Sequence, residues 1–209
     1  MDPGKFEITG KAILFDMDGT LVDSTPCVER VWGNWGRRHG IMLEDILAVS
    51  HGRMTRDTVR AVAPHLDADA EAEVLHQISV TDSEGILALD GARRLLDTLA
   101  PDEWAVVTSA PHSLAEARLA FAGLPVPACL VGAEDVRAGK PDPEGYLKAA
   151  WLLGIAAADC TVVEDTPAGI QAARAAGMRV LAVGTTFPPE ELLDAPWVRD
   201  FAGVTFRRT

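Results

Sequence analysis

Short apolar runs along the chain end abruptly in polar side chains. The run at residues 11–16 ends in an aspartate, the run at 104–109 ends in two hydroxyls, and the run at 160–165 ends in two carboxylates. A fourth run, at 178–183, stops at Gly184. Continuous apolar runs of this length are typical of strands that are buried on both faces of a parallel sheet. The pattern therefore predicts four buried strands, three of which end in polar groups.

Helical patterns separate these runs. Ser24 and Pro26 have the spacing of a helix cap followed by proline in the first turn, and apolar residues then follow at helical spacing. Thr166 and Gly177 bracket another helix, and residues 142–143 open a third. Strands that alternate with helices predict an α/β fold whose parallel sheet is covered on both faces.

The interval from residue 22 to residue 88 breaks this alternation. It contains three or four helical patterns and no convincing strand, and Trp32 and Trp35 stand at helical spacing as candidates for its core. A turn at residues 90–91 then begins a helix at 92–99, which returns the chain to the sheet. We therefore predict an inserted all-helical cap domain at 22–88 and an α/β core domain at 1–21 and 89–209.

Composition and charge exclude several classes of protein. The 209 residues carry 31 acidic and 19 basic side chains, for a net charge of -12, and a surface of that sign repels nucleic acid and anionic lipid. Three widely spaced cysteines indicate reduced, buried thiols rather than a disulfide framework or a zinc site. The amino terminus lacks a signal-peptide pattern, and no run approaches the roughly 18 apolar residues of a membrane helix. We expect a soluble, cytoplasmic monomer or weak dimer with no nucleic-acid or membrane partner.

The polar strand ends are candidates for one shared site, because ligands of open parallel sheets bind beyond the carboxyl ends of the strands. Asp16 and Asp18 stand two residues apart at the first such end, and Glu164 and Asp165 stand at another. Clustered carboxylates favour a hard divalent cation, and Mg2+ is expected because it completes its shell with phosphate and water. A single Asp-x-Asp is equally well explained as a loop turn, but the second pair of carboxylates favours the metal site.

Clustered carboxylates need a metal or a basic partner to stay ionised. Lys140 is the candidate partner, since the proline after it restricts the backbone and a helix begins immediately afterwards. Its ammonium is therefore predicted to occupy a fixed loop position rather than a free helix face.

Four segments, in chain order, resemble the four motifs of the haloacid dehalogenase superfamily. They are FDMDGTLVDS at residues 15–24, VTS at 107–109, GKP at 139–141 and VEDTPAG at 163–169. Within that superfamily the chain most resembles the sugar-phosphate and glycerol-phosphate phosphatases with a helical cap after the first strand, near the β-phosphoglucomutase-like group. The resemblance implies a Rossmann-like core, a helical cap and a Mg2+-dependent hydrolase of small phosphorylated sugars or polyols.

The resemblance also implies roles for single residues. Asp16 matches the nucleophile that becomes an aspartyl phosphate, and Asp18 matches the general acid and base. Asp165 matches a metal ligand, together with the Asp16 carboxylate and the Asp18 main-chain carbonyl. Glu164 matches a residue that supports the metal or its waters.

The phosphate is assigned to two other segments by the same resemblance. Ser109 and the backbone of Ala110 match the phosphate-binding segment, and Lys140 matches the residue that holds both the nucleophile and the phosphoryl charge. Pro111 is a departure, because relatives often carry Ser-Gly after the second strand and proline removes one backbone donor near the phosphate.

Substrate choice is expected to come from the cap. His51, Arg53 and Arg56 follow an apolar patch and are candidates for hydrogen bonding a polyol or steering an anion. For each of them the alternative is an ordinary solvated helix residue.

Two other functions stay open at this point. The first is a phosphosugar mutase similar to β-phosphoglucomutase, which returns the phosphoryl group to sugar rather than to water. The second, of a different class, is a regulatory protein that binds a phosphorylated ligand without turnover. The presence of both Asp16 and Asp18 argues against the second, since a binding protein has no need for the second aspartate.

Overall fold

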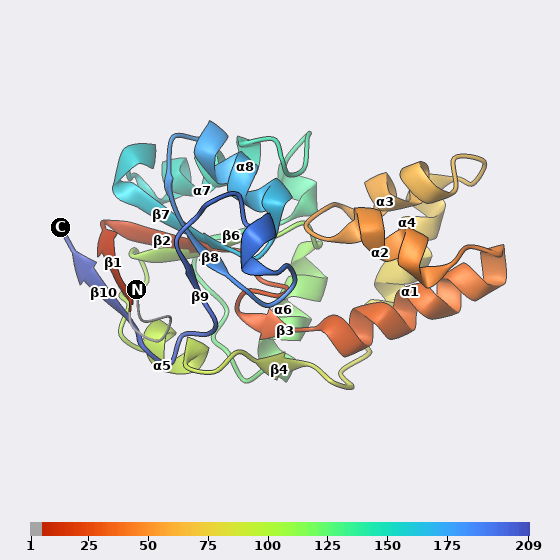
Figure 1. Ribbon diagram of the computed structural model, residues 1–209, viewed down its shortest axis with the longest axis horizontal. Coiled ribbons are helices and arrows are strands. Elements are labelled where there is room, and N and C mark those ends of the chain that lie inside the picture. The colour runs from red at the N-terminus through yellow and green to blue at the C-terminus, as the bar shows by residue number, and fades with distance from the viewer. Residues whose placement is uncertain (1–5) are drawn as a thin grey trace.

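A parallel sheet of six strands forms the centre of the molecule in the computed structural model, which describes residues 6–209 (Figure 1). The strand order is β6-β5-β2-β7-β8-β9, and every neighbouring pair is parallel. Its strands are β2 (Ala12–Phe15), β5 (Trp104–Val107), β6 (Leu130–Val131), β7 (Cys160–Glu164), β8 (Arg179–Val183) and β9 (Trp197–Val198). The four predicted strands are confirmed as β2, β5, β7 and β8. The two-residue strands β6 and β9 were not predicted, because they are too short to produce a pattern.

Helices cover both faces of this sheet, as predicted. Ile13 and Phe15 of β2 belong to an apolar cluster that includes residues of α5 (Ala92–Leu96) and α6 (His112–Phe121). Ala12 and Leu14, which alternate with them, belong to a second cluster with residues of α7 (Glu144–Leu153) and α8 (Pro167–Ala175). Because successive residues of a strand point to opposite faces, β2 is buried on both sides. The helix predicted at 92–99 ends earlier than expected, at Leu96.

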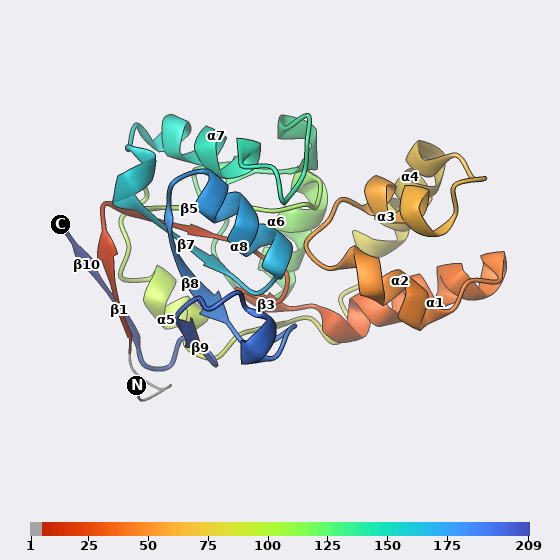
Figure 2. The same ribbon diagram turned by 45° about the horizontal axis from the view of Figure 1, so that its top comes forward.

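A bundle of four helices is inserted between β2 and β5 and lies to one side of the sheet (Figures 1 and 2). Its helices, which we call the helical cap, are α1 (Thr25–His39), α2 (Leu43–Ser50), α3 (Thr55–Val62) and α4 (Ala68–Ser79). Trp32 and Trp35 meet edge to face at 5.4 Å in its interior, so their assignment to the cap core is confirmed.

The prediction that residues 22–88 contain no strand is wrong at both ends of the interval. Strand β3 (Val22–Asp23) leaves the core, strand β4 (Leu87–Ala88) returns to it, and the two pair in an antiparallel manner. The cap is therefore connected to the core through two segments that lie side by side.

The remaining elements lie at the edges of the core. Strand β1 (Phe6–Gly10) pairs in parallel with β10 (Val204–Arg208) in a separate two-stranded sheet that the sequence pattern did not predict.

The three cysteines are buried and unpaired, as expected. Within residues 6–209, no helix is both long and apolar enough to cross a membrane. The described part of the chain also contains three short 3-10 helices, at Ala133–Asp135, Ala157–Asp159 and Pro189–Glu191.

Candidate active site

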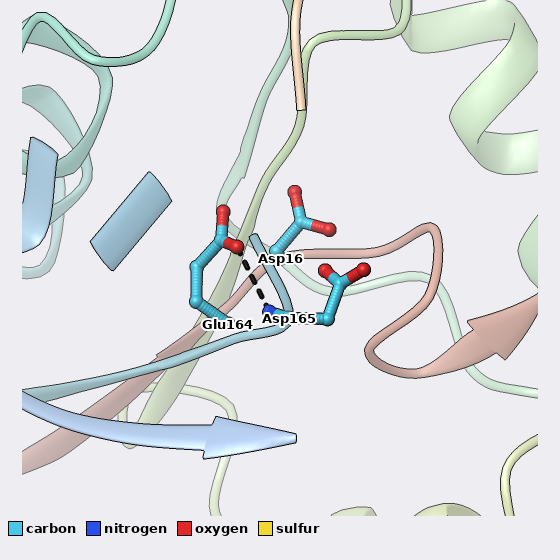
Figure 3. Close-up of side chains that lie close together, drawn as sticks. All are labelled: Asp16, Glu164 and Asp165. Carbon is cyan, nitrogen blue, oxygen red and sulfur yellow. Dashed lines mark hydrogen bonds between the residues drawn. The ribbon is translucent and has the colours of Figure 1, made fainter. Parts of the chain in front are cut away.

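Three carboxylates gather at the carboxyl ends of two neighbouring strands. Asp16 follows β2 directly, Glu164 is the last residue of β7 and Asp165 comes next (Figure 3). All three residues are at most 6% exposed, and one carboxylate oxygen from each lies within 4.8 Å of the others. The adjacency of β2 and β7 in the sheet is what brings residues 148 positions apart, at 16 and 164, to one place.

Lys140 joins two of these carboxylates. Its ammonium donates hydrogen bonds to Oδ1 of Asp16 and, at 2.6 Å, to Oε1 of Glu164. Burial by itself lowers the pKa of Lys140, but the attraction of Asp16 and Glu164 outweighs it and holds the pKa well above its usual value. Lys140 is therefore a fixed positive charge against Asp16, in the loop position that the sequence predicted.

Glu164 has both of its carboxylate oxygens occupied by protein donors. Oε1 accepts from Lys140 and from the Tyr146 hydroxyl at 3.1 Å, while Oε2 accepts from the amides of Asp165 and Thr166 and from the Thr166 hydroxyl at 2.8–3.0 Å. A Cβ at Gly169 would lie 1.7 Å from Oε1, so a glycine is required beside this carboxylate. In this structure Glu164 orients Lys140 and the start of α8.

Asp165 is held by two threonines that the sequence analysis did not single out. Thr20 donates a hydrogen bond of 3.0 Å to Oδ1, and the Thr186 hydroxyl donates to Oδ2. Burial and the nearby charge of Glu164 raise the pKa of Asp165 to about 7, against the effect of these two donors. Thr186 follows the end of β8, so the rule that polar groups follow strand ends could have identified it.

The residues present fit a hard divalent cation. Burial raises the pKa of Asp16 well above its ordinary value, and the charges of Glu164 and Asp165 add to that effect while Lys140 opposes it. When ionised, the three carboxylates carry more negative charge than Lys140 neutralises, which contributes to the raised pKa values of Asp16 and Asp165, and a divalent cation bound to their oxygens would balance it. Beside it, a Cβ at Gly19 would lie 2.1 Å from Oδ2 of Asp165, so only glycine lets the backbone approach so closely. The contribution of the Asp18 main-chain carbonyl stays a prediction.

The side chain of Asp18 is bound by two groups outside the carboxylate cluster. The Ser24 hydroxyl donates a hydrogen bond of 2.7 Å to Oδ1, and Oδ2 lies 2.5 Å from Nη1 of Arg118 in an ion pair. Ser24 occupies the N-cap position of α1 and Pro26 lies in its first turn, as predicted, but the Ser24 hydroxyl binds Asp18 and makes no cap hydrogen bond to a helix amide.

A cavity of about 390 Å3 lies between the strand ends and the helical cap. Asp16, Asp18 and Asp165 line it from the core, and apolar residues of the cap such as Trp32 and Leu75 line it from the other side. Its volume falls within the range of sites for small molecules, roughly 300–1,000 Å3.

The predicted phosphate-binding segment lies at the wall of this cavity. The Ser109 hydroxyl donates a hydrogen bond of 2.8 Å to the carbonyl oxygen of Gly52 in the cap, and the Ala110 amide donates to the Thr108 hydroxyl at 3.1 Å. A Cβ at Gly52 would lie 2.6 Å from Oγ1 of Thr166, which shows how closely the cap loop approaches the core.

The three predicted substrate residues of the cap also line the cavity. The His51 ring packs edge to face on Phe187 at 5.7 Å, and burial lowers the pKa of His51. Arg56 donates to the Met54 sulfur at 3.3 Å, whereas Arg53 is exposed at the rim. The structure thus places all three beside the cavity, and their contact with substrate stays a prediction.

Comparisons with known proteins agree with this geometry. Residues 11–177 match the model of the haloacid dehalogenase-like hydrolases. The chain is 50% identical over 178 residues to hexitol phosphatase A of Escherichia coli, covering 83% of this chain and 82% of that protein. It is 34% identical over 188 residues to glycerol-1-phosphate phosphohydrolase 2 of Saccharomyces cerevisiae, covering 84% and 75%. Among solved structures, a hydrolase from Pseudomonas syringae is 26% identical with a TM-score of 0.79, covering 92% of this chain and 94% of that one.

Proposed function

This chain belongs to the haloacid dehalogenase-like hydrolases, and we propose that it is a Mg2+-dependent phosphatase of small polyol and sugar phosphates, with hexitol phosphates as its first candidates. The observation that carries the proposal is the contact of Lys140 with Asp16, at a cluster of buried carboxylates that opens onto a cavity of about 390 Å3. A nucleophilic carboxylate beside a fixed positive charge is suited to attack on a phosphate monoester, since charge builds up on the equatorial oxygens during transfer.

The proposed reaction has two steps. In the first, a carboxylate oxygen of Asp16 attacks phosphorus, the bond between phosphorus and the alkoxide oxygen breaks, and Asp18 gives that oxygen its proton. In the second, water attacks the aspartyl phosphate, Asp18 takes a proton from it, and the bond to Asp16 breaks to release inorganic phosphate. Lys140 and Ser109 are the groups proposed to hold the phosphoryl oxygens. Bound Mg2+ would neutralise phosphoryl charge, with Asp16 and Asp165 as ligands and Glu164 supporting them.

The substrate class is proposed from the cavity and the relatives together. Polar residues such as Ser50, His76 and Arg118 line the cavity beside apolar ones such as Trp32, and a polyol presents both hydroxyls and C–H faces to such a wall. Two of the relatives are named as a hexitol phosphatase and as a glycerol-1-phosphate phosphohydrolase. His51, Arg53 and Arg56 are proposed to contact the part of the substrate that lies farther from phosphorus.

The test is release of free phosphate from hexitol, glycerol and hexose phosphates and from p-nitrophenyl phosphate, each with and without Mg2+. We expect Mg2+-dependent release that is abolished in Asp16→Asn and retained in Asp102→Asn, an exposed control. Turnover by Asp16→Asn would exclude Asp16 as the nucleophile. Formation of an isomeric sugar phosphate without free phosphate would show a mutase instead, and no turnover of any compound would favour a binding protein.

A further inference from the structure

Arg118 occupies a position on α6 that the helix otherwise fills with apolar side chains. The buried residues of α6 are Leu114, Ala115, Arg118 and Leu119, and the other three belong to an apolar cluster. The Arg118 side chain is only 7% exposed. Arginine is seldom buried unless it is paired, since removing its charge from water is costly. Packing alone would favour an apolar residue here, so the arginine needs another explanation.

The guanidinium of Arg118 is directed at Asp18. Nη1 lies 2.5 Å from Oδ2 of Asp18, while Nε is buried and has no hydrogen-bond partner among the described residues. A purely structural arginine would be expected to satisfy its donors, because each buried donor without a partner is unfavourable. The fold therefore accepts an incompletely satisfied cation in order to place Nη1 against this carboxylate.

The two oxygens of Asp18 have partners of different kinds. Oδ2 is bound by a planar, charged group that buried neighbours hold in place, whereas Oδ1 is bound by the small hydroxyl of Ser24. A serine hydroxyl both donates and accepts, so it can be exchanged for a substrate oxygen at little cost. Arg118 thus forms the fixed side of the carboxylate and Ser24 the exchangeable side.

We propose that Arg118 is a positioning residue that anchors Oδ2 of Asp18, so that Oδ1 faces the leaving oxygen of the substrate and exchanges the proton. The proposal rests on the function proposed above, in which Asp18 is the general acid and base. It assigns a role in that reaction to a residue of α6 that lies 100 positions from Asp18 in the sequence.

If Arg118 served only to stabilise the fold, its replacement would lower the unfolding temperature, whereas the positioning role predicts no such loss. Asp18 is 29% exposed at the cavity, so its carboxylate stays solvated when Arg118 is removed. Removing one partner of a buried ion pair is costly because the other charge stays buried without a partner, and the exposure of Asp18 to the cavity removes that cost here. We therefore expect Arg118→Met to unfold at a temperature equal to or above that of the wild type, while turnover falls.

A comparison of two leaving groups distinguishes the loss of a positioned acid from a general loss of activity. A hexitol or glycerol oxygen must be protonated as it leaves, whereas p-nitrophenolate leaves without a proton. In single-turnover experiments we expect Arg118→Met to slow release of the alcohol from the alkyl phosphate about 30-fold or more, which is part of the roughly 100-fold to 10,000-fold that a general acid contributes, because Asp18 is still present but is no longer held in place. The burst of p-nitrophenol should slow by less than about threefold, because this leaving group departs without a proton and does not need the acid that Arg118 positions. Equal slowing of both would overturn the proposal.

A double-mutant cycle tests whether Arg118 acts through Asp18. In the Asp18→Asn background, Arg118→Met should change the rate of alcohol release by less than about twofold, because the group it positions is already lost. Effects that multiply in the two backgrounds would show that Arg118 acts on its own, and would overturn the proposal.

Two further variants keep the test decisive. Arg94→Met removes an arginine that binds the carbonyl oxygens of Phe201 and Ala202 and does not line the cavity. It should leave the release rates of both leaving groups unchanged. If Arg118→Met fails to fold, Arg118→Gln keeps most of the volume and is measured in the same way, with the same leaving-group dependence expected. A wild type that turns over no phosphate ester would refute the proposed function, whereas an active wild type with leaving-group-independent variants would refute only the role of Arg118.

Discussion

The hydroxyl of Ser109 donates a 2.8 Å hydrogen bond to the carbonyl oxygen of Gly52, and so joins the predicted phosphate-binding segment of the core to the helical cap. The same hydroxyl is proposed to bind substrate phosphate. One donor hydrogen cannot serve both acceptors, so phosphate must replace the Gly52 carbonyl when it binds. If Ser109 binds the phosphate as proposed, arrival of the substrate breaks a contact between cap and core.

Ser109→Ala should therefore weaken use of the substrate. A hydrogen bond to a charged group contributes about 1.5–3 kcal/mol, so we expect kcat/KM for the best alkyl phosphate to fall by about 10-fold to 100-fold. Steady-state kinetics measure this. Ser113→Ala is the matched control, because Ser113 also connects α6 to the cap, through Nε2 of His76 at 3.1 Å, but does not line the cavity. An unchanged kcat/KM in Ser109→Ala would remove Ser109 from the phosphate site.

Replacing Lys140 should affect both stability and turnover. Lys140→Met leaves the buried carboxylates of Asp16 and Glu164 without their cation, and removal of one partner of a buried pair costs about 3–5 kcal/mol. Loss of the charge proposed to stabilise the transition state should lower kcat by about 100-fold or more. Urea unfolding and steady-state kinetics test the two effects. Lys11→Met removes an exposed ion pair with Asp159 and should cost at most about 1 kcal/mol with no loss of turnover.

Magnesium should stabilise the folded chain. A ligand that binds only the native state at 100 times its Kd adds about 2.7 kcal/mol to the free energy of unfolding. We expect the midpoint of thermal unfolding to rise on addition of Mg2+ and to fall back with a chelator. Asp165→Asn should lose most of the rise, while Asp102→Asn, at an exposed position, should keep it. An equal rise in both variants would place the cation elsewhere.

Acid should remove a stabilising contribution from Asp135. Burial alone would raise the pKa of Asp135, but hydrogen bonds from Lys148, from the amide of Gly132 and from His112 lower it to about 2. A folded-state pKa below the ordinary value of 3.8 stabilises the fold above pH 4, and this contribution is lost as the pH falls from about 4 to about 2.

Asp135→Asn should consequently reduce the free energy of unfolding by about 2 kcal/mol at pH 7, and by much less near pH 2. Urea unfolding at both pH values measures the difference. Asp97→Asn breaks an exposed pair with Arg93 and should cost about 0.5 kcal/mol or less. A cost in Asp135→Asn that stayed constant with pH would show that the effect is not electrostatic.

Much of the site could be predicted because parallel strands place their carboxyl ends at one edge. The polar residues after the runs at 11–16 and 160–165 were sufficient to bring Asp16 and Asp165 together in advance. Lys140 followed from the charge that such a cluster requires. These inferences need only strand polarity and electrostatics, which a single sequence contains.

The remaining contacts depend on choices that local sequence does not determine. Ser24 has the residue type and position of a helix cap, yet its hydroxyl binds Asp18, because a serine hydroxyl can either accept from a helix amide or donate to a carboxylate, and the tertiary fold decides between them. Arg118 could have been noticed as a charged residue on the apolar face of α6, but its partner lies in a distant segment. Strands β3 and β4 are two residues each and exist because they pair with one another.

That short pairing has a consequence for how the family can diversify. Val22 and Ala88 face each other in register, so the 65 residues between them form a closed excursion from the core. The entropic cost of closing such an excursion grows only with the logarithm of its length, about 0.6 kcal/mol for each doubling. The segment can therefore be lengthened, shortened or exchanged while the strand ends that hold Asp16 and Asp165 keep their register. Selection for a new substrate can act on one half of the cavity without disturbing the half that is proposed to carry out phosphoryl transfer.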